Sequence, residues 1–407
     1  MNIAVFHNLP SGGAKRALYG LIKYLRKMGC SVDVFVPSTA EERFLPLSEV
    51  ANKLVVIPVR RTLWGSTRSL LTGIPPVKFS LIDLEKSHKE IAGRYINRGK
   101  YDVVLVEQDR YTFSPFILRY LDKPNVYYCQ QPMGAMGAIL QKAWEKLEHN
   151  PVKRWWRRYL NWYMARIDKI NVMSAGYIVT NSYFSRESIL RTYGLNALVS
   201  YLGVDREVFN AYGTERERIA ISVGAVGPRK GHDFIIRALS LVDKSLRPRL
   251  VVVGDQVWRG YAEYLRKLAQ VGEVELDIRS LIDDRELVDL YNKARVFVYA
   301  PYLEPFGLGP IEAMACGTPV IAVKEGGVRE SIIDGYTGFL VERDEQQFAE
   351  AVQRLLENSK HWRVVSENCV NTVKSYWTME KAAERLLRHL ERAREGRRST
   401  TVRIWRE

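Results

Sequence analysis

The stretch EPFGLGPIEAMACGTPVIA at residues 304–322 decides the fold. It follows an apolar run that ends near Pro301, so it leads from an expected strand into a helix that begins around residues 307–310. A helix start offers unpaired N–H groups and the positive end of a dipole, which suit a pyrophosphate. Glu304 precedes those amides and Glu312 lies about one turn inside the helix. Carboxylates repel phosphate, so this pair suits sugar hydroxyls; an ordinary acidic helix start is the alternative.

Outward from this stretch, short apolar runs alternate with helical patterns along the whole chain, which is typical of parallel α/β units. We therefore predict two doubly wound domains, with ligands at the carboxyl ends of the strands. The expected domains are residues 1–205, residues 206–378, and a last helix with a basic tail at 379–407. A further helix is expected at 14–28, with Leu18, Leu21, Ile22 and Leu25 on its buried face. The expected strands are 3–7, 32–37, 54–59, 102–107, 126–130, 177–181, 219–224, 250–254, 274–278, 296–301, 319–323 and 338–341.

The composition is that of a globular protein. The 407 residues are 46% hydrophobic and 26% charged, which excludes disordered and fibrous classes. No apolar run approaches the ~18 residues of a membrane span, and the first residues, MNIAVF, are expected to form a strand and not a signal peptide. The four cysteines lie far apart without metal-ligand spacing, so we expect neither disulfides nor zinc, and a cytoplasmic location.

Positive charge is concentrated in the first half. The formal net charge is +15, and residues 1–200 hold 29 Lys and Arg against 15 Asp and Glu. Such an excess favours an anionic partner, and nucleic acid, acidic lipid, a phosphorylated substrate and a merely solvated basic surface all remain open at this point.

One segment, residues 139–170, departs from the α/β pattern. It contains KRWWRRYLNWY at 153–163, in which Arg alternates with Trp and Tyr. This composition is typical of helices that lie on anionic membranes. The alternative is a helix whose Trp and Tyr side chains pack inside the protein while its Arg side chains face water.

Two glycine-bearing loops follow expected strands and could meet phosphate. The first, GAVGPRKGH at 224–232, brings Arg229 and Lys230 to a strand end, where cations can neutralise a departing diphosphate. The second, PSGGA at 10–14, contains Gly12 and Gly13 at a helix start. Solvated cations and a tight turn are the respective alternatives, and neither loop matches a Walker loop or the full dinucleotide fingerprint.

Together these motifs resemble the retaining glycosyltransferases of family 4. The resemblance rests on the two glutamates eight residues apart within the EPFGL…EAMACGTPVIA block, on the GGA and PRKG loops, and on IDDREL at 282–287 and EGG at 325–327. It covers most of the chain, densely over residues 219–345 and loosely over 1–200. The family has a GT-B fold, with two Rossmann-like domains facing a central cleft, so we expect that architecture here.

The resemblance also implies roles for individual residues. The second domain is expected to bind a nucleoside-diphosphate sugar and the first domain an acceptor. The expected donor-binding residues are Gly12, Gly13, Arg229, Lys230, Leu281, Ile282, Glu304, Phe306, Gly307, Leu308 and Glu312. Among them, Glu312 would hold the ribose, the amides of residues 306–308 the diphosphate, and residues 281–282 the base. Glu304 and Lys230, together with Gln130, are the expected catalytic residues.

The implied reaction transfers a hexose, of mannosyl or glucosyl type, from a GDP- or UDP-sugar to a sugar or lipid-linked acceptor. It needs no metal or other cofactor, because fixed cations and helix amides stabilise the leaving diphosphate. A lipid-linked acceptor would place the protein peripherally on the cytosolic membrane face, through residues 139–170. No nucleic-acid-binding motif occurs, so no nucleic-acid partner is expected.

Two positions depart from the family pattern. Many members carry an Arg where this chain has Ala225, and a His that contacts the donor sugar where it has Gln130. Gln130 can form hydrogen bonds but cannot titrate near neutral pH. Either the enzyme tolerates both changes or its activity is reduced. A degenerate GT-B protein that only binds or scaffolds, and a nucleotide-sugar epimerase on the same fold, are therefore the alternatives.

Overall fold

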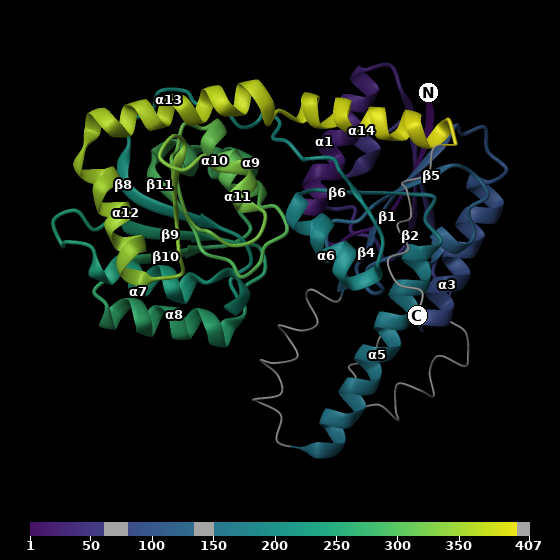
Figure 1. The fold of residues 1–407 in the computed structure, drawn as a ribbon, viewed down its shortest axis with the longest axis horizontal. Coiled ribbons are helices and arrows are strands. Elements are labelled where there is room, and N and C mark those ends of the chain that lie inside the picture. Colours follow the sequence, from purple (N-terminus) through teal and green to yellow (C-terminus); the bar gives the residue numbers. More distant parts are fainter. Residues whose placement is uncertain (61–79, 134–149, 397–407) are drawn as a thin grey trace. The chain divides into compact units, whose positions relative to one another are not determined.

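The structure, a computed structural model, describes residues 1–60, 80–133 and 150–396. The chain divides into two compact units, one formed by Met1–Tyr201 with the chain from Ala383 on, and the other by Leu202–Ala382. We refer to them as the N-terminal and the C-terminal unit, and each is an α/β layer structure around its own parallel sheet (Figure 1).

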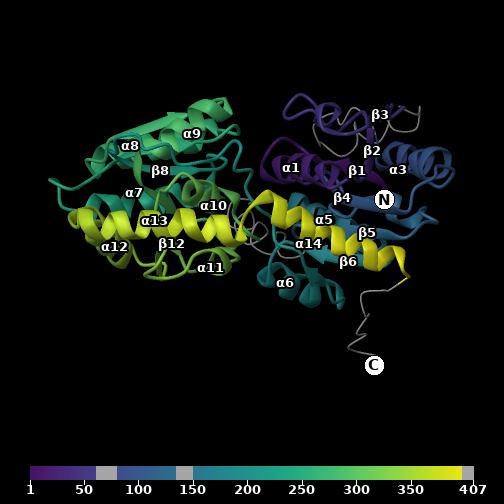
Figure 2. The same ribbon diagram turned by 90° about the horizontal axis from the view of Figure 1, so that it is seen from above.

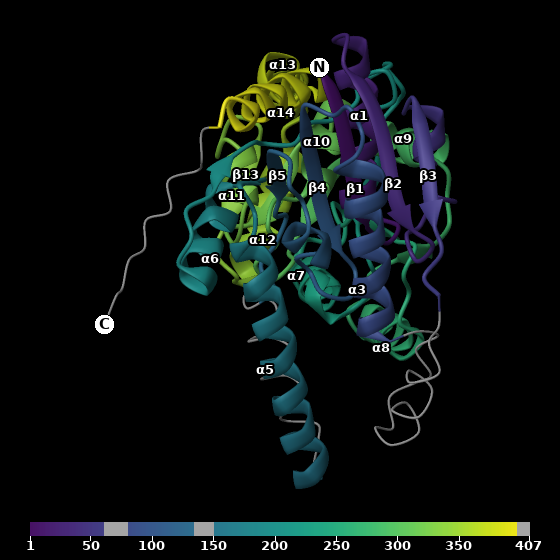
Figure 3. The same ribbon diagram turned by 90° about the vertical axis from the view of Figure 1, so that its right-hand side faces the viewer.

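Within the described residues, the N-terminal unit contains one parallel sheet of seven strands in the order β3-β2-β1-β4-β5-β6-β7. Figures 2 and 3 show the strands from β3 to β5 side by side in this order. The strands are β1 (Asn2–Asn8), β2 (Ser31–Pro37), β3 (Lys53–Ile57), β4 (Val103–Asp109), β5 (Asn125–Tyr128), β6 (Tyr177–Thr180) and β7 (Leu198–Val199).

Helices and short turns connect these strands. They are α1 (Gly13–Lys27), η1 (Leu47–Glu49), α3 (Leu81–Glu90), η2 (Ile91–Ile96), η3 (Phe116–Arg119), α5 (Pro151–Met173) and α6 (Tyr183–Tyr193). The predicted face of α1 is confirmed, because Leu18, Leu21, Ile22 and Leu25 are all buried.

The C-terminal unit has a six-stranded parallel sheet in the order β10-β9-β8-β11-β12-β13, all of it within the described residues. The strands are β8 (Glu217–Val223), β9 (Arg249–Val253), β10 (Leu276–Arg279), β11 (Ala294–Tyr299), β12 (Val320–Val323) and β13 (Gly338–Val341).

Helices cover both faces of this sheet, with α7 and α8 on one side and α9, α10 and α13 on the other (Figure 1). The helices and turns of this unit are η4 (Pro228–Lys230), α7 (His232–Leu241), α8 (Arg259–Val271), α9 (Asp284–Lys293), α10 (Leu308–Ala315), α11 (Val328–Ser331), α12 (Glu345–Glu357) and α13 (Ser359–Tyr376). Helix α14 (Met379–Arg394) follows α13, and from Ala383 on it belongs to the N-terminal unit. The tyrosyl oxygen of Tyr177 lies 3.1 Å from Nδ1 of His389, so the later turns of α14 pack on the N-terminal unit.

Local sequence signals explain several helix starts. The Asp283 carboxylate accepts a hydrogen bond from the Glu286 amide at 2.8 Å, and Asn150 accepts from the amides of Val152 and Lys153. These side chains satisfy amides that the first turn leaves unpaired.

The predicted strands agree with the observed ones to within two residues, with small corrections. The fifth ends at Tyr128 and not at Gln130, because the chain turns before Gln130, and the strand expected at 274–278 runs from Leu276 to Arg279. The strand β7 was not predicted. Its two residues are too few to show the alternation of side chains by which a strand is recognised in a sequence.

Candidate functional site

In the C-terminal unit, the loops after β8 and β11 lie against each other at the carboxyl edge of the sheet. A Cβ atom on Gly231, whose φ is +67°, would lie 2.1 Å from the carbonyl oxygen of Ala300. Only glycine fits this position, because both the contact and the backbone angle exclude a side chain. The Tyr302 amide also donates to the Arg229 carbonyl at 2.9 Å. The loop carrying the predicted cations and the loop carrying Glu304 are thus fixed together.

Across this contact, Lys230 and Glu304 form an ion pair, with 2.9 Å between Nζ and Oε2. Burial raises the pKa of Glu304, but the charge and hydrogen bond of Lys230 and the charge of Arg229 outweigh it, so the pKa lies below its usual value. Each side chain keeps 23% of its surface exposed. The Glu304 carboxyl group is therefore ionised at neutral pH, and both side chains remain accessible to a ligand.

Helix α10 begins next to this pair with open amides. Its N-cap is Gly307 at φ +90°, where a Cβ atom would lie 2.7 Å from the hydroxyl of Tyr299. No side chain caps the helix start and its first turn holds no acidic residue. The start of α10 and its helix dipole can thus attract an anion.

Glu312 lies in the second turn of α10 and is 5% exposed. It accepts a hydrogen bond from the Tyr291 hydroxyl at 3.0 Å, which fixes the direction of its carboxylate. A buried and oriented carboxylate of this kind can bind the two hydroxyls of a ribose.

Arg343 anchors the loop after β11, and sequence reasoning missed it. Its guanidinium pairs with Glu325 at 2.7 and 2.8 Å and donates to the carbonyls of Ala300 and Pro301. It also stacks on the Tyr302 ring at 3.8 Å. No local motif marks Arg343, because its partners lie 18 to 43 residues away in sequence.

The residues predicted to bind the base lie elsewhere on the same edge. Leu281 and Ile282 follow β10. In the sheet, β9 lies between β10 and β8, so β10 is two strand spacings, about 10 Å, away from β8. Leu281 is 83% exposed and has a φ of +56°, which is an uncommon backbone conformation for leucine. Such strain at an exposed strand end is a common feature of binding sites.

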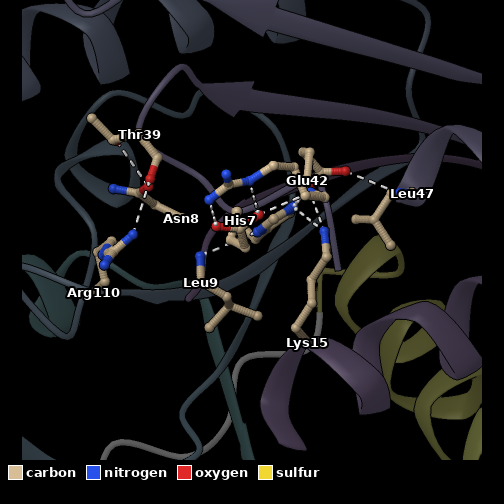
Figure 4. Close-up of polar contacts among 10 residues, drawn as sticks. His7, Asn8, Leu9, Lys15, Thr39, Glu42, Leu47 and Arg110 are labelled. Carbon is tan, nitrogen blue, oxygen red and sulfur yellow. Dashed lines mark hydrogen bonds and ion pairs between the residues drawn. The ribbon is translucent and has the colours of Figure 1, made fainter. Parts of the chain in front are cut away.

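In the N-terminal unit, Gly12 is the N-cap of α1 and Gly13 is the first residue of this helix. A network of polar groups around His7, Lys15 and Glu42 lies in the same unit (Figure 4). Lys15 is fully buried and pairs with Glu42, which also accepts from Nε2 of His7 at 2.8 Å. Nδ1 of His7 accepts from the Leu9 amide at 3.2 Å, so the imidazole is neutral. Consistently, burial lowers the pKa of His7 to about 4.

This network joins three segments of the N-terminal unit. His7 lies on β1, Lys15 in the first turn of α1, and Glu42 on the loop after β2, where its second oxygen accepts from the Leu47 amide at 2.9 Å. It holds the ends of the Gly12–Gly13 turn in place. Sequence reasoning missed it, since its members lie far apart and match no motif.

Gln130 lies two residues after the end of β5 and is 7% exposed. Its side-chain oxygen accepts from Asn181 at 2.9 Å, and its side-chain nitrogen faces Glu107. The structure thus places Lys230, Arg229, Glu304, the α10 amides and Glu312 around one strand edge, whereas Gln130, Gly12 and Gly13 belong to the other unit.

Helix α5 carries the aromatic segment, of which residues 139–149 lie outside the described residues. Three aromatic rings spaced four residues apart form a stripe along this helix. The ring of Tyr159 stacks on that of Trp155, with 6.2 Å between the centroids, and on that of Tyr163, with 6.4 Å. Trp155 and Trp162 are 65% and 56% exposed. The alternative reading of this segment, in which its Trp and Tyr side chains pack inside the protein, is therefore wrong for Trp155 and Trp162. Figures 1 and 3 show the first turns of α5 standing away from the sheet of their unit.

Two further findings hold for residues 1–60, 80–133 and 150–396, the described part of the chain. None of its helices is long and apolar enough to cross a membrane. It also contains no group of three His, Cys, Asp or Glu side chains placed to hold a metal ion.

Comparisons with known proteins identify the family. The model of Glycosyltransferase Family 4 matches residues 11–208, and that of Glycosyl transferases group 1 matches residues 204–371. Together the two matches span residues 11–371, and the chain belongs to glycosyltransferase family 4.

Three relatives illustrate the range of similarity. A D-inositol 3-phosphate glycosyltransferase of Streptosporangium roseum is 34% identical over 47% of this chain and 49% of that one. The chain spans about half the length of this and the other first curated relatives that it matches. The human alpha-1,3/1,6-mannosyltransferase ALG2 is 24% identical over 94% of both chains. Anabaena HepE, solved in complex with UDP-glucose, superimposes with a TM-score of 0.70 at 18% identity, over 96% of this chain and 99% of that one. This last likeness shows the GT-B fold.

The buried ion pair between Lys15 and Glu42 allows a prediction about the stability of the protein. Glu42→Leu leaves the Lys15 ammonium buried without its carboxylate and should lower the free energy of unfolding by about 3–5 kcal/mol. The double variant Lys15→Met/Glu42→Leu removes both charges and should recover most of this loss. Denaturant unfolding at pH 7 measures both.

The matched control is Glu41→Leu, because Glu41 pairs with the exposed Arg43. Its loss should stay below about 1 kcal/mol. A double variant as unstable as Glu42→Leu alone would show that the buried charge is not the cause.

Proposed function

We propose that the protein is a retaining glycosyltransferase, which moves a hexose from a nucleoside-diphosphate sugar to an acceptor. The observation that carries this proposal is the Lys230–Glu304 pair, held beside the open amides of α10 and the buried carboxylate of Glu312. In this arrangement, positive charge can bind a diphosphate, and the two carboxylates can accept hydrogen bonds from sugar hydroxyls.

In the proposed mechanism, the bond between the sugar C1 and the diphosphate oxygen breaks and the diphosphate keeps the electron pair. Arg229, Lys230 and the α10 amides stabilise the negative charge that develops there, in place of a metal ion. Glu304 faces the sugar, on which positive charge develops, and Glu312 holds the ribose. The acceptor oxygen attacks C1 from the same face, and its proton passes to the departing phosphate.

The donor is a UDP- or GDP-sugar of glucosyl or mannosyl type. A uridine donor is supported by the structural likeness to HepE, which was solved with UDP-glucose, and a mannosyl donor by the similarity to ALG2 along nearly the whole chain. Exposed Leu281, with Ile282, would contact the base.

The acceptor is a sugar, and we favour a lipid-linked one at an anionic membrane surface. The exposed aromatic stripe of α5 supports this, because Trp and Tyr side chains favour the membrane interface. Lys153 and Lys169 on the same helix are exposed, and its one described acidic residue, Asp168, is buried. Positive charge near the stripe would attract acidic headgroups. The protein would then be peripheral on the cytosolic membrane face.

The two glutamates should differ in their effects. Glu312→Ala should raise the donor KM and weaken nucleotide binding about tenfold or more, because the ribose loses a charged partner. Glu304→Ala should lower kcat at least as much while nucleotide affinity changes little. Binding calorimetry with UDP and GDP, together with initial rates, separates these effects. Equal small effects of the two variants would contradict the assigned roles.

Membrane contact can be tested by sedimentation with anionic vesicles at low salt. The wild-type protein should sediment, and Trp155→Ser/Trp162→Ser should lower the partition coefficient about tenfold or more, because two indoles no longer enter the interface. The control is Trp258→Ser, which removes a similarly exposed Trp from the C-terminal unit. Failure of the wild type to sediment, or an equal loss in the control, would contradict membrane contact through α5.

A further inference from the structure

Arg343 reaches the loop after β11 from two strands away. In the sheet of the C-terminal unit, β12 lies between β11 and β13, and Arg343 follows the end of β13 by two residues. Its guanidinium donates to the carbonyls of Ala300 and Pro301 at 3.0 and 3.1 Å. Since these two residues come directly after β11, the contact fixes the backbone at the point where the loop leaves the strand.

The guanidinium of Arg343 is itself held in one orientation. Glu325, in the loop after β12, accepts from its Nε at 2.7 Å and from Nη2 at 2.8 Å, which is the two-point geometry of an arginine–carboxylate pair. The ring of Tyr302 lies on the guanidinium, whose carbon is 3.8 Å from the ring centroid. The side chain of Arg343 is only 18% exposed. It therefore joins the loops after β11, β12 and β13.

Two of the joined loops set the position of Glu304. The Glu304 carbonyl accepts from the Gly327 amide at 2.9 Å, and its carboxylate accepts from Lys230 at 2.9 Å. A Cβ atom on Gly326 would lie 2.3 Å from the Glu304 carbonyl oxygen, so the loop after β12 packs directly on this backbone. Gly326 is the chain neighbour of Glu325. Movement of either loop would therefore displace the Glu304 carboxylate.

The carboxylate expected to hold the ribose is fixed by other contacts. Glu312 lies within α10 and accepts from the Tyr291 hydroxyl at 3.0 Å. The end of this helix is held by Arg216, which donates to the Cys316 carbonyl at 2.7 Å. These contacts involve neither Arg343 nor the residues that it binds. The contacts of Arg343 thus concern the part of the site that is expected to face the transferred sugar.

We propose that Arg343 is a positioning residue for Glu304: with Tyr302 and Glu325 it holds the loop after β11 so that the Glu304 carboxylate meets the transferred sugar, while the nucleotide binds without its help. The proposal rests on the role of Glu304 in the proposed function. Accurate placement matters for turnover, because a shift of about 1 Å in a reacting group can cost roughly a hundredfold in rate.

The first test is Arg343→Lys. Lysine keeps a positive charge beside Glu325, but its ammonium group has no planar fork with which to bind the carboxylate and two carbonyls at once, and it cannot lie flat on a ring. We expect kcat to fall about tenfold or more, while the Kd of UDP or GDP changes less than about threefold. Calorimetry with UDP and GDP gives the Kd. The rate of nucleotide release from UDP-glucose or GDP-mannose, with water or an added sugar as acceptor, gives kcat.

The matched control is Arg247→Lys. Arg247 also donates to backbone carbonyls of its unit, those of Ser240, Val242 and Glu273 at 2.6, 2.9 and 3.0 Å. It precedes β9 and therefore lies at the amino edge of the sheet, opposite to the candidate site. Its kcat should stay within about threefold of the wild-type value. An equal loss of kcat in both variants, or a parallel loss of nucleotide affinity in Arg343→Lys, overturns the proposal because it shows a merely structural role.

Tyr302→Leu disturbs the same contact from its other side, and it decides by the same criteria if Arg343→Lys does not fold. It removes the ring on which the guanidinium lies and keeps the backbone N–H that donates to Arg229. We expect kcat to fall again with little change in nucleotide affinity. The double variant should lose little more than Arg343→Lys alone, because both substitutions break one contact. Losses that multiply in the double variant would mean that the two residues act independently, which contradicts the proposal.

These outcomes separate this proposal from the proposed function. If the wild type releases no nucleotide from UDP-glucose or GDP-mannose, the proposed function fails and the positioning role of Arg343 fails with it. If the wild type is active and Glu304→Ala lowers kcat but Arg343→Lys does not, only the positioning role is overturned.

Discussion

The contact between Gly231 and the carbonyl of Ala300 is the constraint on which the candidate donor site depends. It leaves no room for a side chain, and with the hydrogen bond between Tyr302 and Arg229 it joins the loops after β8 and β11. Because the two loops are fixed together, Lys230 meets Glu304 at 2.9 Å and the pair lies beside the start of α10. The parallel sheet supplies this arrangement, since all its strands end at the same edge.

In the candidate donor site, positively and negatively charged side chains lie close together. Arg229 and Lys230 face the expected diphosphate, while Glu304 and Glu312 are held by a lysine and a tyrosine hydroxyl. Ala225 stands where many family members have an arginine, so the proposed site relies more heavily on Arg229, Lys230 and the α10 amides. In the N-terminal unit, Gln130 stands where the family often has a histidine, and the neighbouring titratable group is Glu107.

Much of the fold could be predicted from the sequence, because each strand is a short β-branched run bounded by turn residues. The EPFGL block also gave the helix start and both glutamates, since these residues are close in sequence. Arg343, Glu107 and the Lys15–Glu42 pair could not be found in this way. Each acts through partners on other strands or loops, and only the folded sheet brings them together. The sequence did not decide whether the aromatic side chains of α5 are exposed or buried, because the two kinds of aromatic stripe have the same spacing along a helix.

The central claim is that the C-terminal unit binds a nucleoside-diphosphate sugar through the edge that carries Lys230. Thermal unfolding with a panel of UDP, GDP, UDP-glucose and GDP-mannose tests it most directly, because a ligand that binds only the folded state raises the unfolding temperature. We predict a clear upward shift with one base, and its loss in Lys230→Ala. No shift with any nucleotide, or a shift that Lys230→Ala leaves unchanged, would contradict the account.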